Sequence, residues 1–327
     1  MENKNLVYSA SPHVKGRKTT RQIMLDVLIA LTPACIMGCV YFGLKALLIL
    51  SLSVISAVLS EVIYLLIVGK KFKQILTQFD LTSVITGLLI GMSIGTNYPW
   101  YAPILGSTFA VIVVKMLFGG TGKNLVNPAV TGRIFIFISF QTVVTAWALP
   151  NISSLSGNAL SSGATALPNI FDKNFTLSNW DLLLGTGVSG CIGETCKLAL
   201  ILGGVYLVAR KVINGIYPLI YIVVTGLFTV VLNKSLGVFL PSILSGGLIL
   251  GAIFMATDYT TTPNTTLGNI IYFIILGLVT AGLRQATKME TVSFAILLMN
   301  LFVPLIDKYI INKPFGYKKQ KKTKGAN

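Results

Sequence analysis

The chain has 327 residues, of which 54% are hydrophobic and only 11% are charged. Soluble globular chains carry roughly 25% charged residues, so the composition excludes an ordinary soluble domain and indicates an integral membrane protein. The formal net charge is +16, but the basic residues lie between apolar runs and at the chain ends, as in membrane proteins. We therefore expect no nucleic acid as a partner; the basic tail at 312–327 fits an anionic membrane lipid surface.

Residues 1–22 are polar and lack an apolar stretch ahead of a small-residue cleavage site, so we expect no removable signal peptide. The apolar runs that follow are long enough to cross a hydrocarbon core of about 30 Å. They predict an all-α polytopic membrane protein with about ten transmembrane helices, at 23–43, 46–68, 81–97, 100–118, 131–149, 189–209, 216–233, 239–257, 268–284 and 291–311.

The distribution of Lys and Arg predicts the orientation. With the N-terminus placed in the cytoplasm, few basic residues remain outside, whereas cytoplasmic segments of membrane proteins carry an excess of them. We expect both termini, 1–22 and 312–327, in the cytoplasm and the loop 150–188 outside. The basic residues left outside are Lys45, Lys173, Lys197, Lys234, Arg284 and Lys288.

Two polar connections interrupt the apolar pattern, at 119–129 and 257–264, and each carries Asn or Thr next to Pro. Gly- and Pro-interrupted segments in two halves are typical of transporter folds with a site near the bilayer midplane. We therefore predict two inverted five-helix repeats, one over 23–149 and one over 189–311. The alternative is a pair of ordinary polar loops.

Acidic residues in or near the spans are candidates for an ion pathway, because charges inside a bilayer are costly. Glu61 lies deepest, in the inner half of the second span, and Asp258 begins the second polar connection beside several threonines. Carboxylates, hydroxyls and carbonyls are suitable ligands for a hard cation. For Asp258 the alternative role is helix capping.

The four cysteines occur as two pairs, Cys35 with Cys39 and Cys191 with Cys196. Neither pair has zinc-site spacing with partner His or Cys residues, so we predict no metal site. Small buried apolar residues are the favoured interpretation, and a redox role shared with a partner subunit is the alternative. The sequence also lacks a Walker loop and a Ser-His-Asp set, so ATP-driven transport by this chain is not expected.

The outer loop contains the sequence Ser162-Gly163-Ala164-Thr165. Gly163 and Ala164 leave the backbone uncrowded, and glycine permits a turn that exposes the Thr165 hydroxyl. Such a hydroxyl can be esterified, which would fix a cofactor beside the membrane. The short motif alone is not specific, since Ser- and Gly-rich loops are common.

Taken together, four segments resemble the NqrB/RnfD family, which contains the D subunit of the Rnf electron-transport complex and the B subunit of the sodium-pumping NADH:quinone reductase. The segments are Ser11-Pro12-His13 ahead of 23–34, the Asn-Pro-Ala at 127–129, the motif at 162–165, and 256–263. The resemblance extends over essentially the whole chain. It implies a urea-transporter-like fold of two five-helix halves.

The resemblance also implies a function. A flavin transferase would join FMN through its phosphate to Thr165, the last residue of the Ser162–Thr165 motif, and a riboflavin would bind without a covalent bond. The chain would work with Rnf subunits of the A, B, C, E and G types, which pass electrons between ferredoxin and NAD and couple this to Na⁺ or H⁺ translocation. The chain would not be catalytic alone.

Two other functional classes stay open from the sequence. One is a stand-alone channel or secondary transporter for a small solute without a redox cofactor, and the other is a membrane scaffold with a degenerate flavin site. The second alternative arises because the family motif opens with an acidic residue seven positions before the threonine, where this chain has Asn158.

Overall fold

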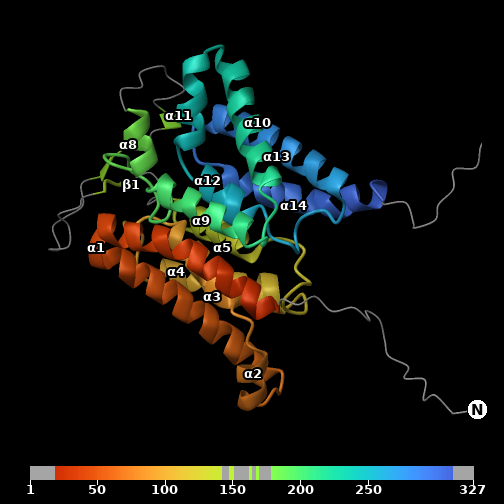
Figure 1. Cartoon of the computed structure of the whole chain (residues 1–327). Coiled ribbons are helices and arrows are strands. Elements are labelled where there is room, and N and C mark those ends of the chain that lie inside the picture. The colour runs from red at the N-terminus through yellow and green to blue at the C-terminus, as the bar shows by residue number, and fades with distance from the viewer. Residues whose placement is uncertain (1–18, 142–146, 151–161, 164–166, 169–177, 312–327) are drawn as a thin grey trace, which may run out of the picture.

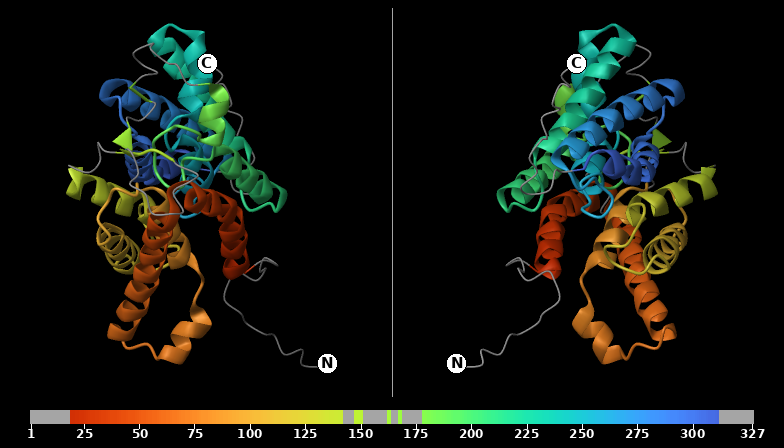
Figure 2. Two further views of the ribbon diagram at one scale, coloured as in Figure 1. Left: turned by 90° about the vertical axis from the view of Figure 1, so that its left-hand side faces the viewer. Right: turned by 90° about the vertical axis from the view of Figure 1, so that its right-hand side faces the viewer.

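The computed structural model describes residues 19–141, 147–150, 162–163, 167–168 and 178–311. Helices dominate this part of the chain (Figure 1), as predicted. Figures 1 and 2 show the helices of the first half and those of the second half as two adjoining groups.

The first two predicted spans are the two arms of one long helix, α1 (Thr20–Ile67). A capping box begins it: Thr19 Oγ1 accepts from the Gln22 backbone N–H, and the Gln22 side chain accepts from the Thr19 N–H. The arms meet at Gly43, whose φ of 67° is accessible to glycine without a side-chain clash. Figure 2 shows the two arms diverging.

The rest of the first half is built from shorter helices. Asn127 begins the last of them, because its side-chain oxygen caps the backbone N–H groups of Ala129 and Val130, and Pro128 suits the first helical position. The elements are α2 (Phe72–Gln78), α3 (Thr82–Met92), α4 (Ala102–Phe109), the π-helical η1 (Ala110–Met116) and α5 (Pro128–Ser139).

Two segments correct the predicted span boundaries. The fifth span was predicted to reach residue 149, but α5 ends at Ser139, and β1 (Trp147–Ala148) pairs antiparallel with β2 (Ser162–Gly163). The sixth was predicted from residue 189, but its helix begins at Lys197. In the intervening segment 189–196, the backbone N–H groups of Ile192 and Gly193 donate to the carbonyls of Ile94 and Met92. These apolar residues are buried, but their backbone pairs across the chain rather than within a helix.

The second half contains a broken helix around Gly246. The helical segments on either side of Gly246 are bent by 66°, and Gly246 has a φ of 63°. The elements after the outer loop are α8 (Asn179–Leu184), α9 (Lys197–Ala209), α10 (Ile216–Asn233), η3 (Leu236–Val238), α11 (Phe239–Leu244), α12 (Leu248–Leu250), the π-helical η4 (Gly251–Met255), α13 (Thr266–Thr287) and α14 (Val292–Tyr309).

The halves meet where α9 packs against α1. Large apolar side chains point outward from α1, α10 and α14, as expected for surfaces facing lipid or other membrane subunits. In the described part of the chain, four helices are long and apolar enough to cross a membrane, or five when the bent pair around Gly246 counts as one span. The chain is therefore a helical multi-pass membrane protein. Each of the ten predicted spans overlaps a helical stretch, several of which are short.

Candidate functional site

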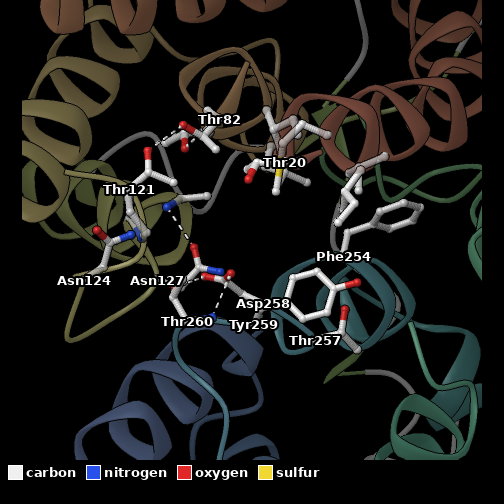
Figure 3. Close-up of a pocket in the computed structure, with 18 of the residues that line it drawn as sticks. Thr20, Thr82, Thr121, Asn124, Asn127, Phe254, Thr257, Asp258, Tyr259 and Thr260 are labelled. Carbon is white, nitrogen blue, oxygen red and sulfur yellow. Dashed lines mark hydrogen bonds between the residues drawn. The ribbon is translucent and has the colours of Figure 1, made fainter. Parts of the chain in front are cut away.

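A pocket of about 410 Å³ lies between the two halves (Figure 3). Its walls are mostly apolar, with contributions from α1, α3, α9 and η4, and its polar groups come mainly from the two polar connections. Figure 3 shows Asp258 and Tyr259 on the opposite side from Thr20 and Thr82. An apolar cavity of this size with a few convergent polar groups is typical of a small-molecule site.

The two polar connections predicted from sequence meet at this pocket. The Asn127 side-chain amide donates to the Met255 carbonyl over 3.0 Å, joining residues 128 positions apart in the chain. Asn124, Asn127 and Asp258 all line the cavity. The connections do not occupy equivalent places in the halves, however: one precedes α5, the fifth helix of its half, and the other precedes α13, the fourth helix of the second half.

Asp258 forms the start of a polar turn rather than a helix cap. Its carboxylate accepts hydrogen bonds from the Thr260 hydroxyl at 3.0 Å and the Thr261 hydroxyl at 3.4 Å. The cap of α13 is instead Thr265, whose hydroxyl oxygen accepts from the Gly268 N–H. Burial raises the pKa of the Asp258 carboxyl, and the hydrogen bonds from Thr260 and Thr261 oppose that rise. Asp258 is therefore a half-buried acid on the pocket wall, and the capping interpretation is wrong.

Glu61 does not itself line the pocket, but it is connected to it through Lys115. The Lys115 ammonium donates to a Glu61 carboxylate oxygen at 3.0 Å, to the Thr82 hydroxyl at 2.6 Å and to the Ser83 hydroxyl at 3.0 Å. Lys115 and Thr82 are pocket residues. The sequence interpretation missed Lys115 as a site residue; the signal was a single lysine inside the apolar run 110–118.

A second cluster of buried charges was also missed. Arg133 pairs with Glu194 at 3.0 Å, and Arg284 pairs with Glu290 at 2.8 Å. The two pairs flank the break at Gly246 and Gly247, where a β-carbon would collide with the Glu290 or the Glu194 carboxylate. Arg133 was not among the basic residues predicted to lie outside, but it contacts Glu194 in the segment that follows the outer loop.

The loop motif is described only in part. The backbones of Ser162 and Gly163 form β2, opposite Ala148 and Trp147. Ala164 and Thr165 lie outside the described residues. Cys191 and Cys196 are buried and Cys35 and Cys39 half-buried, all as free thiols. Within the described ranges, His, Cys, Asp and Glu form no group of three or more that could hold a metal ion.

The profile described as the NQR2, RnfD, RnfE family matches residues 7–316. The chain belongs to this family. It is 37% identical over 325 residues to the D subunit of the Na⁺-translocating ferredoxin:NAD⁺ oxidoreductase complex of Acetobacterium woodii, covering 98% of this chain and 99% of that protein.

Two further relatives agree with this placement. The D subunit of the proton-translocating ferredoxin:NAD⁺ oxidoreductase complex of Clostridium ljungdahlii is 35% identical, covering 94% of this chain and 95% of that protein. The D subunit of the ion-translocating oxidoreductase complex of Stutzerimonas stutzeri is 33% identical, covering 92% of this chain and 93% of that protein. The chain is thus a homologue, over nearly its whole length, of the D subunits of multi-subunit oxidoreductase complexes that translocate ions.

Proposed function

We propose that the chain is the D-type membrane subunit of a complex that couples electron transfer between ferredoxin and NAD to the translocation of Na⁺ or H⁺. The observation that carries this proposal is the similarity to such subunits over nearly the whole of both chains. The remaining subunits, of the A, B, C, E and G types, would supply the ferredoxin and NAD sites. The pocket between the halves gives this subunit a place for a small redox molecule.

The first cofactor in this proposal is FMN joined through its phosphate to Thr165. The motif 162–165 supports it, and so does the pairing of β2 with β1, which fixes the chain two residues before the threonine. A covalent bond keeps the flavin beside the membrane, while the ring chemistry belongs to the cofactor. A flavin transferase would be needed for maturation, and Asn158 would replace the acidic residue at the start of the motif.

Changing Thr165→Ala is expected to abolish the covalent flavin of this subunit, because alanine has no hydroxyl to esterify. The fluorescence of the subunit on a denaturing gel should be lost, together with the FMN-phosphoryl increment in its intact mass. Thr176→Ala, in the same loop, is the matched control and should keep both signals. A flavin that persists in Thr165→Ala would place the attachment elsewhere. Its absence from the unsubstituted chain, in cells that contain the transferase, would favour a channel or a scaffold.

The second cofactor is a non-covalent riboflavin, which we place in the pocket between the halves. The cavity volume of about 410 Å³ falls in the usual range of about 300–1,000 Å³ for ligand pockets. Phe254 and Leu89 offer apolar walls for a planar ring. Asn124 Oδ1 is buried there without a hydrogen-bond partner, so it can accept from a polar edge of the ring. When bound, riboflavin would supply the capacity to accept and return electrons.

We further propose ten spans in two inverted halves, with both termini cytoplasmic and the Thr165 loop outside. A turn with positive φ before α3 and another before α12 support the repeat: Leu81 has a φ of 68° and Gly246 a φ of 63°. The charge distribution supports the orientation. The short helices would complete their spans through the non-helical backbone that packs inside the protein.

Asp258 and Glu61 are proposed to belong to the ion pathway at the inner face. Asp258→Asn keeps the size of the side chain and one accepting oxygen but removes its negative charge. In the reconstituted complex we expect it to lower the ion gradient formed per electron pair at least several-fold while ferredoxin oxidation continues. Asp181→Asn in the outer segment is the control. An unchanged gradient in Asp258→Asn would remove Asp258 from the pathway.

A further inference from the structure

Each half has a buried cation beside a positive-φ turn, the turn at Leu81 before α3 in the first half and the turn at Gly246 before α12 in the second. In the first half the Lys115 ammonium bonds the hydroxyls of Thr82 and Ser83, directly after Leu81. In the second half the Arg284 guanidinium bonds the carbonyls of Ser242 and Ser245, directly before Gly246. Both cations stand near the C-terminal ends of long helical stretches, in the fourth helix of each half.

The two cations differ in how completely they are neutralised. Arg284 contacts both carboxylate oxygens of Glu290, at 3.1 and 2.8 Å, and lies away from the pocket. Lys115 contacts only one oxygen of Glu61, and the other oxygen is buried without a hydrogen-bond partner. Glu61 is only 7% exposed, so bulk water does not hydrate this second carboxylate oxygen.

Lys115 is also the cation that reaches the cavity, since it lines the pocket together with Thr82, Thr86 and Asp258. A buried ammonium on a flexible stem can redirect its N–H groups, because it acts as a point charge with three rotatable donors. Its three N–H groups bond Glu61, Thr82 and Ser83, and rotation about the stem can turn one of them toward negative charge in the pocket. The planar Arg284 guanidinium is instead held by four hydrogen bonds.

We propose that Lys115 tunes the non-covalent flavin in the pocket and links the charge of that flavin to Glu61. The inference rests on the proposed function, since it takes the pocket to hold this flavin. Reduction by two electrons from the ferredoxin side and one proton from the cytoplasm leaves one negative charge in the pocket. Lys115 turns an N–H group from Glu61 toward that charge, and the Glu61 carboxylate then takes up one cation from the cytoplasmic side. Reoxidation returns the two electrons and releases the proton and the cation.

The test is a redox titration of the whole complex in a Thr165→Ala background, so that the covalent flavin of this chain does not contribute. Lys115→Met should lower the midpoint potential of the pocket flavin, because the reduced form loses its cation. A tenfold change in the redox equilibrium corresponds to about 30 mV for a two-electron couple, and we expect at least that shift. Glu61→Gln should raise the potential by a similar amount and remove its dependence on the translocated cation.

Lys197→Met is the matched control, because Lys197 is a buried lysine outside the pocket whose ammonium donates to the Glu194 carbonyl. It should leave the potential unchanged. Unshifted potentials in both Lys115→Met and Glu61→Gln would overturn the inference. If Lys115→Met fails to assemble, Glu61→Gln decides alone. Failure of the proposed pocket site gives a different result: no flavin would be extracted by denaturing the Thr165→Ala subunit.

Discussion

Gly203→Ala is expected to separate α9 from α1 and destabilise the chain strongly. A β-carbon at Gly203 would lie 2.2 Å from the Ala30 carbonyl oxygen, which is a backbone atom and cannot rotate away. Overpacking a well-filled interior typically costs about 1–3 kcal/mol, and here the two helices must move apart. We expect a lower midpoint of thermal unfolding in detergent, measured by size-exclusion chromatography after heating.

Gly282→Ala is the matched control for this experiment. Gly282 lies in α13, and a β-carbon there would have no atom within 4 Å. Replacing a helical glycine by alanine in open space gains about 0.8–1.0 kcal/mol from helix propensity. The control should therefore be as stable as the unsubstituted chain or more so. Equal stability of Gly203→Ala and Gly282→Ala would contradict the close approach of α9 and α1.

The helical fold was predictable because apolar runs are the strongest signal that a membrane imposes on a sequence. The boundaries failed where buried backbone is not helical. The segment around Ile192 and Gly193 is apolar enough to pass for a span, but its N–H groups bond to carbonyls in the first half. Such pairing depends on residues about a hundred positions away, and local hydropathy does not contain that information.

In the candidate site too, some residues could be predicted from the local sequence and others could not. Asp258 and Asn127 were recognisable because each stands in a polar connection between apolar helices. Lys115 was not, since its meaning comes from Glu61 and Thr82, which lie 54 and 33 positions earlier in the chain. A single lysine in an apolar run indicates that it has a buried polar or acidic partner. Only the packing of α1, α3 and η1 shows which residues those partners are.

Removing the Arg284 side chain with Arg284→Met should destabilise the second half by about 3–5 kcal/mol, the usual cost of breaking a buried ion pair. Arg284 is 1% exposed, and its guanidinium bonds the Ser242 and Ser245 carbonyls as well as Glu290. Its loss leaves the Glu290 carboxylate buried without a cation. It also leaves the Ser242 and Ser245 carbonyls, just before Gly246, without their hydrogen bonds from Arg284. The unfolding midpoint in detergent should fall well below that of the unsubstituted chain.

Two further variants identify the cause of this loss. Glu290→Gln added to Arg284→Met should restore part of the stability, because an amide removes the uncompensated charge and its oxygen still accepts from the Gly247 N–H, as Glu290 does at 3.0 Å. Arg210→Met breaks the ion pair with Asp26, in which the arginine side chain is 54% exposed and the Asp26 side chain 7% exposed. The Tyr206 hydroxyl still donates to Asp26 at 3.1 Å after this change, so the loss of stability should be smaller than in Arg284→Met. A loss in Arg210→Met as large as in Arg284→Met, or no recovery in the double variant, would show that desolvated charge at the Gly246 break is not the cause.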